Sequence, residues 1–246
     1  MANLEPLIQS IPVAPLKLAS LEGCRTLADQ VNNYLVSFRH ESPTNVGQAD
    51  SLQGYCADSY LLECECPRFG SGEGKGVLKE SVRGCDLFIM VDVTNYSLTY
   101  RVNGYENHMS PDNHYQDLKR IISAADGKAR RINVIMPFLY EGRQHKRSKR
   151  ESLDCALMLQ ELVDMGVSNI LTFDAHDPRV SNSIPLHGFD SFMPTYQFLK
   201  ALVNSVPDFV IDNDHLMIIS PDEGAMGRAV YFSNILGVDM GMFYKR

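Results

Sequence analysis

The chain has 246 residues, of which 44% are hydrophobic, so it is long enough for one large or two small domains with sizeable cores. Its net charge of −7 argues against a nucleic-acid partner, because contacts with many phosphates need a broad basic face. No apolar run approaches the roughly 18–20 residues of a membrane span, and no basic and apolar leader opens the sequence. We therefore expect a cytoplasmic protein with no membrane partner.

The predicted elements alternate along the chain. Helical spacing of apolar residues predicts helices near residues 21–38, 114–125, 153–165, 197–203 and 225–236. Short apolar runs predict strands near residues 61–66, 86–91, 132–136, 169–173, 216–219 and 238–243. Residues 40–59 are polar and Gly-containing, which predicts a loop. Such alternation calls for right-handed crossovers and a mostly parallel sheet covered on both faces, so the fold class is α/β.

Six cysteines are scattered along the sequence, most of them within or beside apolar stretches. Cys64 and Cys66 have the wrong spacing for a zinc knuckle or a redox Cys-x-x-Cys pair. Because alternate residues of a strand share one face, we interpret this pair as buried thiols.

A cationic loop follows the predicted strand at residues 132–136. Five of the eight residues from 143 to 150 are Lys or Arg, in a chain that is otherwise acidic. Open α/β sheets bind ligands at the carboxyl ends of their strands, so this loop is positioned to bind a polyanion. Taken alone, such residues more often form a solvated basic loop.

Two further predicted strands end in polar side chains of similar chemistry. Asp174 and His176 follow one strand, and Ser220, Pro221 and Asp222 follow another. Carboxylate and imidazole groups can hold a metal, and the start of a helix after Ser220 favours an anion. Taken alone, His176 is more often a hydrogen-bonded structural residue. Three such strand ends together predict a phosphate-transfer site.

Five ordered blocks resemble ribose-phosphate pyrophosphokinase, the family that makes phosphoribosyl pyrophosphate. The blocks are Arg68-Phe69-x-x-Gly72-Glu73, Val82-Arg83-Gly84-x-Asp86, Arg143-Gln144, Asp174-x-His176 and Ser220-Pro221-Asp222-x-Gly224. The likeness runs from about residue 61 to the last residue. It implies two phosphoribosyltransferase-like parallel-sheet domains, which we place at residues 1–190 and 191–246. Residues 93–111 are longer than the family's usual connection and look like an insertion.

The resemblance also implies a set of site residues. ATP would be bound by residues of two loops, which are Phe69, Ser71, Glu73, Arg143, Gln144 and Lys146. The first of these loops completes an adjacent subunit's site in the family, so we expect a homo-oligomer. His176 and Asp222 would hold Mg²⁺, which prefers hard ligands and keeps several waters. Lys245 matches the family's catalytic lysine, although a terminal lysine is also consistent with a frayed tail.

The sequence departs from the family pattern at several of these positions. Ser71 replaces an aspartate, His145 replaces an aspartate, Asp177 replaces an alanine, and Ala225 replaces a glycine. The family's acidic ribose-phosphate loop, Asp-Asp-x-x-x-Thr-Gly-Gly-Thr, does not occur in these residues. We therefore expect the second domain to be incomplete and these residues alone not to turn over.

The leading functional prediction is a magnesium-dependent transferase that converts ribose 5-phosphate and ATP into phosphoribosyl pyrophosphate and AMP. The alternative is a non-catalytic relative that binds nucleotide as a regulatory subunit, which the altered residues permit. A plain phosphoribosyltransferase is disfavoured, because the Arg-Gln loop is extra to that class.

Overall fold

The computed structural model describes residues 14–41 and 54–244. Lys245 and most of the predicted 40–59 loop lie outside these ranges. The chain divides into two compact units, Met1–Phe192 and Met193–Arg246, and each is described by itself. Within the described ranges, no helix combines the length and the apolar character that crossing a membrane requires.

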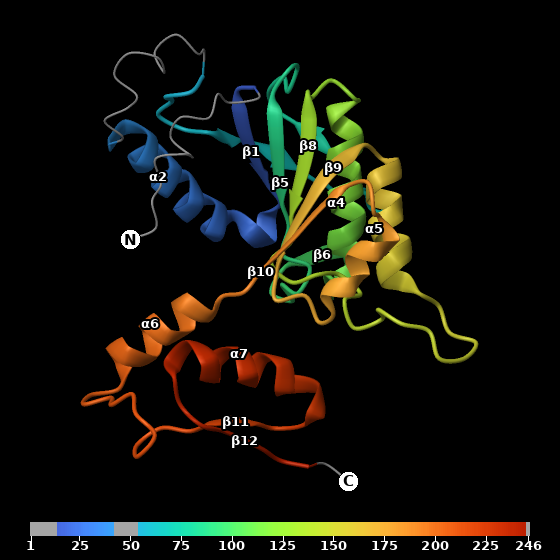
Figure 1. Cartoon of the computed structure of the whole chain (residues 1–246). Helices are drawn as coiled ribbons and strands as arrows, with labels where there is room; N and C mark the ends of the chain where they lie inside the picture. The colour runs from blue at the N-terminus through green and yellow to red at the C-terminus, as the bar shows by residue number, and fades with distance from the viewer. Residues whose placement is uncertain (1–13, 42–53, 245–246) are drawn as a thin grey trace. The chain divides into compact units, whose positions relative to one another are not determined.

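A six-stranded parallel sheet forms the centre of the first unit, in the order β10-β9-β8-β5-β1-β2 (Figure 1). Its strands are β1 (Leu16–Ser20), β2 (Leu61–Leu62), β5 (Asp86–Met90), β8 (Arg131–Ile135), β9 (Val167–Phe173) and β10 (Gly188–Phe192). Because all the strands run in one direction, their carboxyl ends meet at one edge of the sheet. The predicted α/β class with a parallel sheet is confirmed.

Helices cover both faces of this sheet, α2 (Arg25–Glu41) on one side and α4 (Pro111–Ala125) and α5 (Asp154–Asp164) on the other (Figure 1). Successive residues of β5 point to opposite faces. Leu87 and Ile89 accordingly belong to the large core under α4 and α5, whereas Met90 packs with Ala28 of α2 in a smaller cluster. This double burial explains why the central strands are continuous apolar runs.

The helices begin and end close to the predicted residues. The predicted 21–38 helix starts as a 3₁₀ turn, η1 (Glu22–Cys24), and α2 then continues to Glu41, so the expected loop starts too early in the prediction. The α4 helix starts one turn earlier than predicted. Ser110 caps it by accepting a hydrogen bond from the Asn113 backbone N–H at 3.3 Å, and Pro111 occupies the first turn.

The predicted strand at 61–66 is in fact two short strands with different partners. β2 pairs in parallel with β1, whereas β3 (Cys64–Glu65) pairs in antiparallel fashion with β4 (Val77–Leu78). The chain leaves the main sheet after Leu62 and returns through the Gly-rich loop at residues 67–76. Cys64 is buried, and Cys66 is half-buried against the same core, which agrees with their expected shared face.

A β-hairpin occupies the 93–111 segment, which the sequence analysis left without strands. Its strands are β6 (Thr99–Val102) and β7 (Tyr105–His108). The turn residues Asn103 and Gly104 both have positive φ, at 48° and 86°, the backbone that a two-residue type I′ turn requires. Strands β1 and β10 were also not predicted.

A chain of polar side chains crosses the sheet on the face that α2 covers. The Arg131 guanidinium donates to both carboxylate oxygens of Asp86, and Asn133 Nδ2 donates to Asp86 Oδ1 at 2.7 Å. Asn169 Nδ2 then donates to Asn133 Oδ1 at 2.6 Å. A Cβ on Gly188 of the next strand would lie 2.0 Å from Asn169 Oδ1, so only glycine fits beside this amide.

The second unit is a smaller α/β arrangement. The parallel pair β11 (Ile218–Ser220) and β12 (Met240–Met242) is connected through η4 (Glu223–Ala225) and α7 (Met226–Leu236), and α6 (Thr195–Ser205) precedes it. Gly237, with φ of 68°, ends α7 in the left-handed conformation.

In the first unit, η3 (Pro178–Ser183) connects β9 to β10.

The polar chain predicts a measurable stability effect. Asp86→Asn removes the charged acceptor of Arg131 and leaves the buried Asn133 amide facing a second amide, so the free energy of unfolding should fall by about 1.5–3 kcal/mol. Urea denaturation measures this change. Asp126→Asn is the matched control, because Asp126 is an exposed residue paired only with Lys128. Equal midpoints for the two variants would contradict the assigned role of Asp86.

Candidate functional site

The basic loop lies at the carboxyl end of β8, as its place in the sequence predicts. Arg143 and Lys146 are exposed, and the Arg143 guanidinium lies 5.9 Å from the centre of the Phe138 ring. Gln144 closes the loop. Its Nε2 donates to the Ser152 carbonyl at 2.7 Å, and its own carbonyl accepts from the Cys155 backbone N–H at 3.4 Å. Gln144 therefore fixes the loop ends and leaves the cations at the surface.

A small pocket of about 250 Å³ adjoins Arg143 at the ends of β5 and β8. Its lining comprises Val93, Thr94, Pro111, Phe138, Tyr140, Glu141, Gly142 and Arg143. Tyr140 Oη donates to Asp112 Oδ1 at 2.5 Å, and the Tyr140 ring stacks on the ring of Tyr115 with 4.6 Å between the ring centres. Partial burial, together with the nearby carboxylates Asp154 and Asp112, raises the pKa of Glu141. An aromatic ring beside a guanidinium suits a flat, anionic ligand.

The end of β9 brings His176 next to His145 of the basic loop. The two ring centres lie 5.0 Å apart, and His145 Nε2 is 3.6 Å from Asp177 Oδ2. Asp177 also accepts three hydrogen bonds from the Arg179 side chain and one from its backbone N–H. Arg179 thereby holds the pKa of Asp177 well below its usual value. The two unusual residues, His145 and Asp177, thus contact each other beside His176.

The two predicted metal ligands belong to different units of the chain. His176 is exposed at the end of β9. Asp222 follows β11 and caps η4, where its Oδ1 accepts from the Ala225 backbone N–H at 3.0 Å. One carboxylate oxygen of Asp222 is thereby used structurally. Among the described residues, no group of three or more His, Cys, Asp or Glu side chains forms a metal site. Magnesium keeps several of its waters in proteins, so it needs few protein ligands.

The predicted adenine-binding loop is a tight turn between β3 and β4. The Phe69 backbone N–H donates to the Glu73 carbonyl at 2.7 Å, and Gly72 N–H donates to the Phe69 carbonyl at 2.9 Å. This turn exposes 54% of Phe69. Ser71 Oγ donates to Glu73 Oε2 at 2.8 Å. The serine thus orients Glu73, and a single negative charge remains in the loop.

A buried ion pair anchors this loop to α4, and sequence reasoning missed it. Arg68 donates two hydrogen bonds to Asp117, at 2.6 and 2.8 Å, and Arg120 donates a third at 2.6 Å. The side chain of Asp117 is only 6% exposed and that of Arg68 only 9%. A Cβ on Gly76 would lie 2.4 Å from the Arg120 carbonyl oxygen, so the glycines allow the loop to approach the helix.

The two thiols of β3 and its continuation are not reactive nucleophiles. Burial raises the pKa of Cys64 to about 11 and that of Cys66 to about 12. Cys64 Sγ donates to the Ser20 carbonyl at 3.1 Å. Since the thiolate is the nucleophilic form, both groups are neutral and inert near pH 7.

Comparisons with known proteins agree with this geometry. Residues 16–166 match the family model of the N-terminal domain of ribose phosphate pyrophosphokinase. That match covers more than half of the sequence, and the chain belongs to the ribose-phosphate pyrophosphokinase family.

Individual relatives extend the comparison. Ribose-phosphate pyrophosphokinase of Staphylococcus epidermidis is 27% identical over 190 residues, which are 76% of this chain and 53% of the relative. The protein of the same name from Oceanobacillus iheyensis is 25% identical over 189 residues, with the same two shares. The chain thus spans about half the length of the curated relatives it matches.

A solved structure shares the fold. Phosphoribosylpyrophosphate synthetase from Mycobacterium smegmatis superposes with a TM-score of 0.71 at 22% sequence identity. The match covers 94% of this chain and 65% of that chain.

Proposed function

We propose that this chain binds magnesium-ATP and serves the transfer of pyrophosphate from ATP to the anomeric hydroxyl of ribose 5-phosphate. The observation that carries the proposal is the meeting of two loops at one sheet edge. The β8 loop brings the Arg143 guanidinium beside Phe138, and the β9 end brings His176 against His145 of the same loop. Arg143 and Phe138 also line a pocket of about 250 Å³.

In the proposed reaction, the anomeric oxygen attacks the β-phosphorus of ATP and the bond from that phosphorus to the α-phosphate oxygen breaks. AMP leaves, and the hydroxyl proton is lost to solvent or to a base. Negative charge spreads over the phosphate oxygens as the bond breaks, so catalysis depends on positioning and charge neutralisation. Arg143 and Lys146 supply cationic donors for these oxygens, because guanidinium and ammonium groups stay charged at neutral pH.

Magnesium, when bound, would neutralise part of the charge on the ATP phosphates. His176 and Asp222 are the residues that the family resemblance assigns to it, and Lys245 is the residue that the resemblance assigns to the transferred pyrophosphoryl group. Gln144 acts here mainly by holding the loop closed, as its two hydrogen bonds at the loop ends indicate.

A non-catalytic, nucleotide-binding role is the second candidate. It is favoured by polar side chains of the loops that already bond to one another. Ser71 and Glu73 bond to each other, and Asp177 is paired with Arg179. These contacts reduce the number of charged groups free to act on a substrate, while they leave Arg143 and Phe69 exposed.

ATP binding tests the site itself. Arg143→Ala removes a charged hydrogen-bond donor and should weaken magnesium-ATP binding by roughly 10- to 150-fold, the equivalent of about 1.5–3 kcal/mol. Titration calorimetry measures the affinity of the intact chain and of the variant. Arg130→Ala, at an exposed arginine on the turn before β8, is the matched control and should bind as the parent does. Unchanged affinity in Arg143→Ala would refute the assignment.

Complementation tests the proposed homo-oligomer. If Phe69 completes a neighbour's site, Phe69→Ala and Arg143→Ala should each lower ATP binding in all sites. Refolding the two variants together at equal amounts should restore parental affinity in about a quarter of the sites, because mixed dimers then hold one intact site of two. No recovery, in a mixture that sedimentation shows to be dimeric or larger, would place Phe69 in its own subunit's site or in none.

Sugar-dependent AMP release separates the two candidate functions. The transferase predicts sustained AMP formation with ribose 5-phosphate, magnesium and ATP, and a strong loss of that rate in Arg143→Ala. The binding relative predicts saturable ATP binding without AMP release. Ribose without its phosphate is the control substrate, and AMP formed equally well with it would contradict a ribose 5-phosphate transferase.

A further inference from the structure

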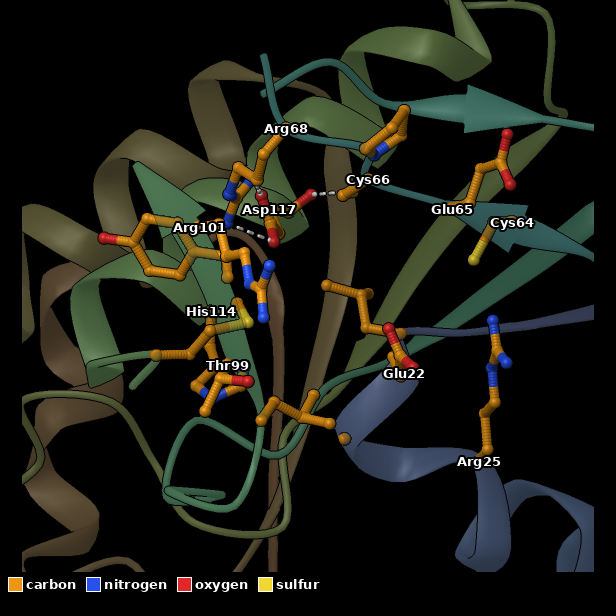
Figure 2. A pocket seen from close by; sticks show the side chains of 16 residues that line it. Glu22, Arg25, Cys64, Glu65, Cys66, Arg68, Thr99, Arg101, His114 and Asp117 are labelled. Atoms are coloured by element: carbon orange, nitrogen blue, oxygen red, sulfur yellow. Dashed lines mark hydrogen bonds and ion pairs between the residues drawn. The ribbon is translucent and has the colours of Figure 1, made fainter. Parts of the chain in front are cut away.

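A larger pocket lies beside β1. In the strand order of the sheet, β5 separates β1 from β8, the strand that precedes the basic loop. The pocket has a volume of about 470 Å³, within the range of small-ligand sites (Figure 2). Three segments and one helix form it, namely the start of α2, the continuation of β3, the 93–111 hairpin and α4. None of its lining residues belongs to the pocket at the end of β8.

Side-chain hydrogen bonds fix the walls of this pocket to one another. Asn95 Nδ2 donates to the Gly23 carbonyl at 3.0 Å and so joins the base of the hairpin to the start of α2. The Asn95 carbonyl in turn lies 2.6 Å from His114 Nε2 of α4. A Cβ on Gly23 would approach Asn95 to 3.2 Å, so the glycine allows this contact. The pocket is therefore a preformed feature of the first unit.

The pocket is lined by three arginines and three acidic residues, and its unpaired charges are mostly positive. Arg25 and Arg101 line it, and within residues 14–41 and 54–244 neither guanidinium forms a hydrogen bond or ion pair. Figure 2 shows Arg101 reaching in from the hairpin and Arg25 from the start of α2, on opposite sides of the view. Arg68, the third arginine of the lining, is paired with Asp117.

The acidic residues of the lining do not cancel this excess. Asp117 is shared by two arginines, and Glu65 is paired with Lys79 at 2.6 Å. Glu22 forms no ion pair with any cation of the described part of the chain, and it lies between Arg25 and Arg101 in the view of Figure 2. Among the described residues, the lining therefore leaves two unpaired guanidinium groups and one unpaired carboxylate. Apolar side chains of Leu21, Leu98 and Met109 complete the surface.

We propose that this pocket is a second ligand site, distinct from the ATP site, that binds a small hydroxylated organic phosphate. Arg25 and Arg101 bind the phosphate oxygens, because a guanidinium fork donates two parallel hydrogen bonds to such a group. Glu22 accepts hydrogen bonds from the hydroxyl groups. The apolar side chains contact the carbon skeleton. The hairpin gains a role as one wall of this site.

Glucose 6-phosphate is the probe, and calorimetry with the intact chain is the measurement. Arg25→Gln and Arg101→Gln should each weaken its binding roughly 10- to 150-fold, while Arg130→Gln leaves it unchanged. All three arginines are exposed, so the variants should keep the parental melting temperature. Arg143→Ala should weaken ATP binding and leave glucose 6-phosphate binding unchanged, which separates this site from the proposed ATP site.

Two further comparisons define the ligand class. Glu22→Gln should lower the affinity for glucose 6-phosphate relative to inorganic phosphate, because only the sugar donates hydroxyl hydrogen bonds. Malate, a hydroxylated dianion that lacks a phosphate group, should bind more weakly than glucose 6-phosphate. The proposal is overturned if no phosphate binds saturably, if the Arg25 and Arg101 variants bind as the parent does, or if malate binds as tightly.

Discussion

The carboxylate of Asp117 is the group on which the arrangement around β3 depends. It is buried, and a buried charge is tolerated only when its oxygens are fully paired. Arg68 and Arg120 provide that pairing from two directions. One arginine comes from the Gly-rich turn and the other from the same helix as Asp117. The ion pair therefore fixes the turn against α4, with Phe69 held outward and Arg68 held inward.

Parallel strand direction sets where chemistry can occur in this unit. The loops after β1, β5, β8 and β9 all leave the same edge of the sheet, so residues distant in sequence converge there. Two pockets follow from this arrangement, one at the end of β8 and one beside β1. Both combine arginine with an aromatic or apolar surface. The fold thus places two arginine-lined pockets on one scaffold.

Periodicity and motif order predicted much of the fold. Strands β5, β8 and β9 and helices α4 and α5 are apolar on the faces they bury, so their pattern is visible. β1 and β10 are as long as β5 and β8, and they were missed because polar residues such as Lys17 and Asp190 interrupt their apolar runs. The hairpin was missed although Asn103-Gly104 is a strong turn signal, because its strands are mostly exposed and lack an apolar face.

Part of the site was equally visible in sequence. Arg143 and His176 follow predicted strands, and the structure places each at the end of its strand. Contacts between distant residues were not visible. Arg68 and Asp117 are 49 positions apart, and no local pattern links them. The contact of His145 with His176 likewise depends on the register between β8 and β9, which sets where each strand ends relative to the other.

The chain of polar side chains from Asp86 to Asn169 holds the strands in that register. Side chains in a parallel sheet alternate between faces, so a slip of one residue would turn Asn133 toward the apolar core under α4 and α5. Such a slip would leave the Asn133 amide without a hydrogen-bond partner and would place Ile132 or Val134 against Asp86. Gly188 adds a steric condition, since only its alignment accommodates the Asn169 side chain. The amides therefore fix the strand register at the middle of the sheet. This register in turn brings His145 and His176 together at the carboxyl edge.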